Sequence, residues 1–214
     1  MTKAREILKQ YWHFDQFRPL QEDIVNAALE GKDVLALLPT GGGKSICFQV
    51  PSMAQDGCSI VISPLIALMT DQVENLKKRG ISAIAINSSL DSNQRELALH
   101  NAANGYYKFI YLSPESLESE RLLHRLSFVR VNQIVVDEAH CISQWGYDFR
   151  PAYLNISKLR DLFPEIPCLA LTATATEAVA LDIQEKLKFK EAASFFRKSF
   201  ERPELAYNVL HIEA

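Results

Sequence analysis

Short runs of apolar residues alternate along the chain with longer segments in which apolar residues recur every three or four positions. Most of the short runs are continuously apolar, which is typical of strands buried on both faces of a parallel sheet. We predict six such strands, at residues 34–38, 59–63, 83–87, 109–112, 133–137 and 168–172. Five helical patterns lie around and between them, at residues 20–29, 65–79, 91–104, 152–162 and 177–188.

This alternation predicts an α/β domain of three layers with a mostly parallel central sheet. Glycine at positions 31, 80 and 105 ends three of the helical patterns, and Asp91 is a capping residue at the start of another. Two short β-like stretches follow at residues 194–196 and 205–210. They are edge strands or the beginning of a linker.

Composition narrows the class of protein. The 214 residues are 48% apolar and 23% charged, which fits one globular core and excludes general disorder. The net charge of −3 excludes wholesale electrostatic binding of nucleic acid, so any such contact must be a local patch. The four cysteines form no CxxC pair, which argues against a zinc cluster or a disulfide framework. We expect a cytoplasmic protein, nucleoid-associated if bacterial, without a secretory signal or a membrane span.

Three of the eight glycines are consecutive, in the segment Leu38-Pro39-Thr40-Gly41-Gly42-Gly43-Lys44-Ser45 between a predicted strand and a helix. Glycines let the backbone turn tightly and aim N–H groups at phosphate oxygens, and the helix adds the positive end of its dipole. Lys44 would neutralise the β- and γ-phosphates, and Ser45 would bind Mg²⁺. Leu38 departs from the pattern GxxxxGK[ST]. The alternative is a glycine-rich turn with a solvated lysine.

An acidic pair opens the segment Asp137-Glu138-Ala139-His140 at the end of a predicted strand. Nucleotide sites lie at the carboxyl ends of parallel strands. We therefore predict that Asp137 holds Mg²⁺ through water and that Glu138 orients and deprotonates the attacking water, with His140 as a further catalytic candidate. The alternatives are a solvated strand end for the acidic pair and a polar residue at a helix start for His140.

Together, the glycine-rich loop and the 137–140 box resemble superfamily 2 helicases, in which the residue before Pro-Thr-Gly is not usually glycine. The segment 141–153, CISQWGYDFRPAY, is similar to the aromatic-rich loop of RecQ-family DNA helicases. The resemblance starts at residues 17–21 and continues through 63–72, 112–115, 171–176 and 199–204. It implies a RecA-like P-loop NTPase fold, ATP and Mg²⁺ as cofactors, and an ATP-dependent 3′–5′ DNA helicase of recombination or repair.

An adenine-recognition motif is implied by the resemblance at residues 17–21. Gln21 can donate and accept one hydrogen bond each at the adenine edge, which would favour ATP over GTP. Phe14 is placed like the family's adenine-stacking aromatic, and Arg18 could cover the other face of the base. The alternative is that Phe14 and Phe17 anchor the helix at 20–29. The cofactor-binding candidates are Phe14, Arg18, Gln21, Thr40, Gly41, Gly42, Gly43, Lys44 and Ser45, with Ser45 and Asp137 as metal ligands.

The aromatic-rich loop is the candidate DNA contact. Aromatic faces stack on unpaired bases whatever their sequence, and arginine can bind phosphate or stack. Gly146 and Pro151 argue against the alternative, a half-buried strand. The loop candidates are Trp145, Tyr147, Phe149, Arg150 and Tyr153. The family usually has histidine where Tyr147 stands.

Hydroxyl groups follow several predicted strands. Thr172 and Thr174 could hydrogen-bond to the 137–140 box and relay the nucleotide state to the DNA face. In the alternative interpretation Thr174 or Thr176 caps the helix at 177–188. The serines at 63, 88 and 113 could follow a DNA phosphate chain.

We expect N-terminal helices with the adenine motif at 1–30, a RecA-like lobe at 31–200 and a lead-in to a second lobe at 201–214. The resemblance implies that a second RecA-like lobe supplies an arginine finger. Its partners would be that lobe and single-stranded or junction DNA. By itself the chain should bind ATP weakly, hydrolyse it poorly and not unwind DNA. Two alternatives stay open: a DEAH-type RNA helicase or double-strand translocase, and a nucleotide-responsive binding module without catalysis.

Overall fold

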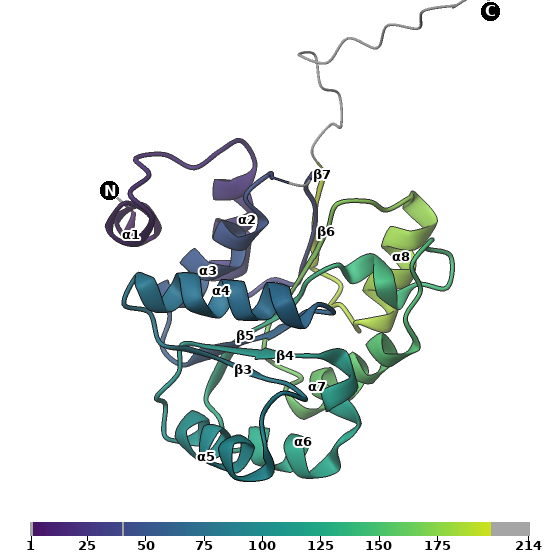
Figure 1. Ribbon diagram of the computed structural model, residues 1–214. Coiled ribbons are helices and arrows are strands. Elements are labelled where there is room, and N and C mark those ends of the chain that lie inside the picture. The colour runs from purple at the N-terminus through teal and green to yellow at the C-terminus, as the bar shows by residue number, and fades with distance from the viewer. Residues whose placement is uncertain (1, 40, 198–214) are drawn as a thin grey trace, which may run out of the picture.

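Seven strands form one sheet in the computed structural model, which describes residues 2–39 and 41–197 (Figure 1). The order of the strands is β3-β4-β2-β5-β6-β1-β7, and every neighbouring pair is parallel. The strands are β1 (Val34–Leu37), β2 (Cys58–Ile62), β3 (Ala83–Ile86), β4 (Phe109–Leu112), β5 (Val131–Val136), β6 (Cys168–Thr172) and β7 (Ser194–Arg197). The predicted α/β class and parallel sheet are confirmed.

All six predicted strands are present, and the stretch at 194–196 forms the edge strand β7. The stretch at 205–210, the motif at 199–204 and the predicted lead-in at 201–214 lie outside the described residues. The α-helices are α1 (Lys3–Ile7), α2 (Gln21–Leu29), α3 (Lys44–Ala54), α4 (Ile66–Lys78), α5 (Ser92–Ala103), α6 (Glu120–Leu126), α7 (Ile156–Leu162) and α8 (Glu177–Lys186). Asp91 caps α5, as predicted, in a capping box with Gln94.

Shorter helical turns complete the described chain. They are the π-helical η1 (Leu8–Trp12) and the 3₁₀ turns η2 (Pro114–Glu118), η3 (Ala139–Ile142) and η4 (Pro151–Asn155). The single helix predicted at 152–162 is wrong. Its first part is η4, which begins at Pro151, and only its second part is the α-helix α7.

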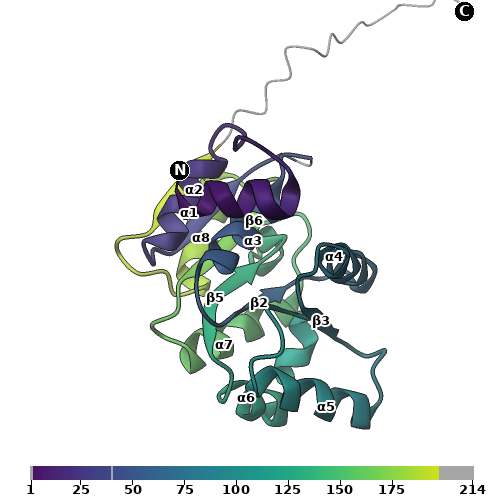
Figure 2. The ribbon, with the colours of Figure 1, turned by 90° about the vertical axis from the view of Figure 1, so that its left-hand side faces the viewer.

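Helices cover both faces of the sheet and give it the expected three layers (Figures 1 and 2). Alternate residues of β1 show the division: Val34 and Ala36 pack with α1, α2, α3 and α4, whereas Leu35 and Leu37 pack with the α5–α8 side. The strands are buried on both faces, which explains their continuously apolar sequences. None of the described helices is long and apolar enough to span a membrane.

The order β5-β6-β1 brings three segments that are distant in sequence to one end of the sheet. The glycine-rich loop leaves β1, the 137–140 box leaves β5, and the threonines at 172 and 174 leave β6. The loop is tied to β6 by a hydrogen bond from Leu38 N to Thr172 O of 3.0 Å. Carboxyl ends of parallel strands are where ligands bind in open α/β sheets.

At the opposite end of the sheet, a buried ion pair joins Asp33 to Arg160. The Arg160 Nη2 atom lies 3.1 Å from Asp33 Oδ2, and the two side chains are 3% and 0% exposed. Arg160 also donates to Leu187 O and Ile166 O, and Asp33 accepts from the N–H groups of Cys168 and Lys190. The pair therefore holds the starts of β1 and β6 to α7 and to the end of α8.

Candidate active site

Backbone geometry requires glycine at two points of the loop between β1 and α3. Gly41 and Gly43 have φ angles of 78° and 75°, in the left-handed region that side chains disfavour. A Cβ atom at Gly43 would also lie 2.3 Å from Gln21 Nε2. The helix α3 starts at Lys44, so its first N–H groups have no intrahelical acceptor. The loop has the backbone features of a phosphate cradle. Thr40 lies outside the described residues.

Gln21 is buried, and its amide is bonded to the loop and its surroundings. The Oε1 atom accepts from Arg18 N at 2.8 Å, and Nε2 donates to Gly42 O and Gly43 O at 3.3 and 3.1 Å. Arg18 Nη1 donates to Gly41 O at 2.7 Å. In this arrangement Gln21 and Arg18 hold the carbonyls of the glycine-rich loop. To read an adenine edge, Gln21 would have to exchange these partners.

The two phenylalanines of the N-terminal segment differ in exposure. The Phe14 side chain is 51% exposed. Phe17 is partly buried and packs against the apolar cluster beneath α1–α4. The structural interpretation as an anchor therefore fits Phe17, whereas Phe14 offers the free ring that stacking on a base requires.

The acidic pair lies across the site from the glycine-rich loop. Lys44 Nζ is 3.2 Å from Glu138 Oε1, and the two side chains are mostly buried. Burial raises the pKa of Asp137, while the charge of Lys44 acts in the opposite direction. Glu138 has a φ of 47°, and its N–H donates to Asp137 Oδ1 at 3.0 Å. A left-handed backbone at a non-glycine residue persists only where the surroundings enforce it, so Glu138 is held in place.

His140 connects the acidic pair to β6 and to the aromatic-rich loop. Its Nδ1 atom lies 2.8 Å from Thr172 Oγ1 and 3.4 Å from Glu138 Oε2. Its ring stacks on Tyr147 with centroids 5.3 Å apart and an interplanar angle of 17°. The Tyr147 hydroxyl is 3.4 Å from Thr174 Oγ1. Burial lowers the pKa of His140, which favours the neutral ring.

The aromatic-rich loop divides into exposed and buried side chains. Trp145 and Tyr147 are 78% and 81% exposed, and they line a cavity of about 440 Å³ with Thr174. Tyr153, which the sequence suggested as a stacking residue, is fully buried and donates its hydroxyl to Asp137 O at 2.9 Å. That part of the prediction is wrong. The side chain instead supports the backbone of the acidic pair. The cap of α8 is Thr176, not Thr174.

Phe149 and Arg150 lie at the inner end of this loop. Phe149 is partly buried. Arg150 pairs with Asp148 at 3.1 Å, and Asp148 also accepts from Cys141 Sγ at 3.6 Å. The donor atoms of His140, Cys141 and Asp148 lie within 4.8 Å of one another. Because burial raises the pKa of the Cys141 thiol to about 12 and Arg150 is paired with Asp148, we interpret these groups as a hydrogen-bonded cluster and not as a metal site.

A cavity of about 400 Å³ lies between the glycine-rich loop, α4 and the acidic pair, and Lys44, Ser45, Asp137 and Glu138 all line it. A hydroxyl and a carboxylate are oxygen ligands of the kind that Mg²⁺ accepts, and Mg²⁺ keeps several waters. The residues present therefore fit this ion. Gln72, which is not among the predicted site residues, also lies here, with its Nε2 3.4 Å from Ser45 Oγ. It stands in the 63–72 motif, which was the only signal for it.

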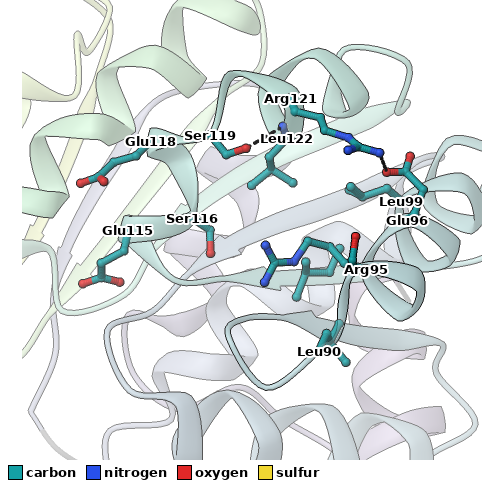
Figure 3. Close-up of a pocket in the computed structure, with 12 residues that line it drawn as sticks. Leu90, Arg95, Glu96, Leu99, Glu115, Ser116, Glu118, Ser119, Arg121 and Leu122 are labelled. Carbon is teal, nitrogen blue, oxygen red and sulfur yellow. Dashed lines mark hydrogen bonds and ion pairs between the residues drawn. The ribbon is translucent and has the colours of Figure 1, made fainter.

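A larger cavity, of about 570 Å³, lies at the β3 side of the sheet between α5 and the η2–α6 segment (Figure 3). Arg95 reaches into it, and Arg121 pairs with Glu96 at 2.6 Å on its rim. Glu115 and Glu118 also line it. It contains neither the glycine-rich loop nor the acidic pair, so its size does not make it the nucleotide site.

Comparison with known proteins agrees with this geometry. The family model for the DEAD/DEAH box helicase matches residues 18–182. The chain is 45% identical over 210 residues to the "Probable ATP-dependent DNA helicase RecS" of Bacillus subtilis, covering 98% of the chain and 42% of that protein. It is 42% identical over 206 residues to the ATP-dependent DNA helicase RecQ of Haemophilus influenzae, covering 96% of the chain and 33% of that protein.

Solved structures bear on the fold. The crystal structure of the DUF1998 helicase MrfA bound to DNA matches 92% of the chain and 29% of that protein, with a TM-score of 0.73 and 15% identity. This likeness confirms the RecA-like fold of helicase domains. The chain spans less than half the length of each relative. The chain belongs to the DEAD/DEAH box helicases, and within that family it is homologous to the RecQ-type ATP-dependent DNA helicases.

Proposed function

We propose that the chain is the first motor lobe of an ATP-dependent DNA helicase that moves 3′–5′ along single-stranded DNA. Residues 1–30 would carry the adenine-recognition motif, and residues 31–200 would form the ATP-binding lobe. The RecQ-type relatives support DNA as the substrate, and the resemblance to that family supports the polarity and a role in recombination or repair.

Each side chain of the site has a role in this proposal. The loop at 41–43 and the first turn of α3 would hold the phosphates by their N–H groups, with Lys44 neutralising their charge. Glu138 would orient the attacking water and accept its proton. Because Glu138 is paired with Lys44 in this structure, binding of a phosphate to Lys44 would free the carboxylate for the water.

Ser45 and Asp137 are the proposed Mg²⁺ ligands, Asp137 through water. When bound, Mg²⁺ would neutralise charge on the β- and γ-phosphate oxygens. The raised pKa of Asp137 supports the assignment, because a nearby cation would relieve the cost of burying this carboxylate.

The observation that carries the proposal is the chain of contacts from the phosphate loop to the aromatic-rich loop. Lys44 contacts Glu138, Glu138 contacts His140, and His140 stacks on Tyr147. A change at the γ-phosphate end alters the partners of Glu138, so it can alter the position of the exposed aromatic rings. We propose that this chain of contacts is the link between nucleotide and DNA that a motor lobe needs.

The test uses Trp145 as its own reporter. The other tryptophan, Trp12, is buried, so a change of fluorescence on adding single-stranded DNA would come from Trp145. We expect oligo(dT) to quench the signal, ATP to change the affinity, and Trp145→Phe to remove the response. The same experiment with oligo(U) separates a DNA helicase lobe from an RNA helicase lobe. Equal responses to both, or no response to either, would contradict the proposal.

A second RecA-like lobe would supply the arginine finger, which is worth roughly 10³–10⁵ in rate in related NTPases. We therefore expect the 214 residues alone to bind ATP, hydrolyse it poorly and not unwind DNA. Strong DNA-stimulated ATPase activity of this chain would refute that expectation. The alternative is a nucleotide-responsive module without catalysis. Glu138→Gln in the complete protein distinguishes the two. The substitution would stop ATP turnover by an enzyme, but it would leave the response of a sensor to nucleotide unchanged.

A further inference from the structure

Two buried hydroxyl groups line the nucleotide cavity without a hydrogen-bond partner among the described residues. They are Ser63 Oγ and Tyr111 Oη, and both residues are 2% exposed. An unpaired buried hydroxyl costs stability, so native proteins rarely keep one without a reason. Ser63 follows β2 and Tyr111 lies in the adjoining strand β4, where it pairs in register with Val61. The two hydroxyls therefore come from neighbouring strands at the same end of the sheet.

Because Ser63 is buried, it does not fit the role of contacting DNA phosphates that its place at a strand end suggested. Its side chain belongs to the lining of the nucleotide cavity. By contrast, Ser88 is exposed and Ser113 Oγ is bonded to Ser116 Oγ at 2.9 Å. Ser63 is thus the member of the three strand-end serines that faces the nucleotide.

A polar layer of two glutamine side chains leads from Tyr111 to the proposed metal ligand Ser45. Gln49, which is 3% exposed, donates through Nε2 to Gln72 Oε1 at 3.1 Å. Gln72 donates to Ser45 Oγ at 3.4 Å. Burial raises the pKa of Tyr111, the adjacent Gln49 side chain acts in the opposite direction, and the negative charge of Asp137 raises it further, so the tyrosine is neutral beside this carboxylate.

The polar groups of this layer are suited to bind water molecules. Its groups are hydroxyls and amides, which can both donate to and accept from water. Mg²⁺ loses its waters reluctantly and is usually bound by one or two protein oxygens with the rest of its shell as water. Ser45 and Asp137 are two such oxygens on the wall of the same cavity. Buried hydroxyls beside them are suited to bind waters of that shell.

We propose that Tyr111 and Ser63 are positioning residues that hold the water shell of the nucleotide's divalent cation. The inference rests on the proposed function, because it assumes that the cavity receives Mg²⁺ with ATP. It extends that function to two side chains that the motifs do not assign. Among the described residues neither hydroxyl meets a hydrogen-bond partner of good geometry, and the waters of a hydrated cation would supply one.

The experiment measures ATP binding to the 214-residue chain by calorimetry, once with Mg²⁺ and once with EDTA. The variants are Tyr111→Phe and Ser63→Ala, and the control is Tyr106→Phe, because Tyr106 is 66% exposed and lies outside the cavity lining. With Mg²⁺ we expect each variant to bind roughly three- to tenfold more weakly, as for the loss of one hydrogen bond. With EDTA we expect wild-type affinity.

Thermal melting without nucleotide supplies a second readout. Removing an unpaired buried hydroxyl should leave the Tm of Tyr111→Phe unchanged or raised, whereas a hydroxyl bonded within the protein would lower it. Unchanged Mg²⁺-dependent affinity, an equal loss with EDTA, or a lowered Tm would each overturn the inference while leaving the proposed function intact. Failure of the wild-type chain to bind ATP in either condition would refute the proposed function itself.

Discussion

Two features of the structure require glycine at position 43. Its φ of 75° lies in the left-handed region, and the position of a Cβ atom is taken by Gln21 Nε2. Gln21 cannot easily move, because its amide is bonded to Arg18 N and to the loop carbonyls. Gly41 has a similar φ but open space at the Cβ position. Alanine substitutions at these two glycines therefore distinguish the cost of backbone strain from the cost of crowding.

We predict that Gly43→Ala destabilises the protein by about 2–3 kcal/mol and Gly41→Ala by about 1 kcal/mol, since both carry the cost of a left-handed alanine and only the first displaces Gln21. Urea denaturation without nucleotide measures both free energies of unfolding. Equal losses of unfolding free energy in the two variants would mean that the Gln21 side chain can move away at no energetic cost, which would contradict the prediction.

The buried carboxylate of Asp137 lowers the stability of the folded protein at neutral pH. Its pKa is raised by burial, so the native state resists ionisation more than the unfolded chain does. As pH rises above the usual carboxyl pKa of about 4, the unfolded state ionises first and the native state loses stability. We predict that Asp137→Asn is more stable than wild type at pH 7 and that the difference shrinks toward pH 4. Thermal melts at the two pH values check this, and a variant less stable than wild type at pH 7 would contradict it.

At the scale of single residues, the sequence predicted which residues form the site better than it predicted their hydrogen-bond partners. The glycine-rich loop and the acidic pair were recognisable because their chemistry follows from local spacing. The partners of Gln21 and the burial of Tyr153 were not, because they depend on segments far away in the sequence. Tyr111 stands in an apolar run and reads as an ordinary strand residue.

Among the elements, the strands were the most predictable. Their continuously apolar runs reflect burial on both faces of the sheet, and each predicted strand is present. The edge strand β7 was left open as a strand or linker, because it alternates between exposed and partly buried residues. The helix α6 was missed because it is only seven residues long, and η4 was taken for the start of a helix.

The Asp33–Arg160 pair is a buried ion pair that joins several elements away from the site. We predict that Arg160→Met destabilises the protein by roughly 3–5 kcal/mol, because Asp33 would remain buried without its cation. Urea denaturation measures the loss. The control is Arg121→Ala, which breaks the largely exposed pair with Glu96 and should cost about 1 kcal/mol or less. Similar losses in the two variants would contradict the role of the buried pair.

At the scale of the whole molecule, the strand order brings the proposed site together. β5, β6 and β1 are neighbours, so residues almost a hundred positions apart in sequence meet as Lys44 and Glu138. The motifs and the resemblance predicted that meeting. They did not predict that the two side chains would pair directly, because the direction of each side chain depends on how the site is packed.

The pairing makes Glu138 a competitor of the phosphates for Lys44. Removing the charge of Glu138 frees Lys44, so Glu138→Gln should bind ATP at least as tightly as wild type. Removing Lys44 deletes a charge-assisted contact to phosphate, so Lys44→Ala should bind roughly 10- to 100-fold more weakly.

Equilibrium binding of ATP in the presence of Mg²⁺ to wild type, Lys44→Ala and Glu138→Gln tests the central claim that this site is a nucleotide site controlled by these two residues. We expect a large loss for Lys44→Ala and no loss for Glu138→Gln. Wild-type affinity in Lys44→Ala would contradict it.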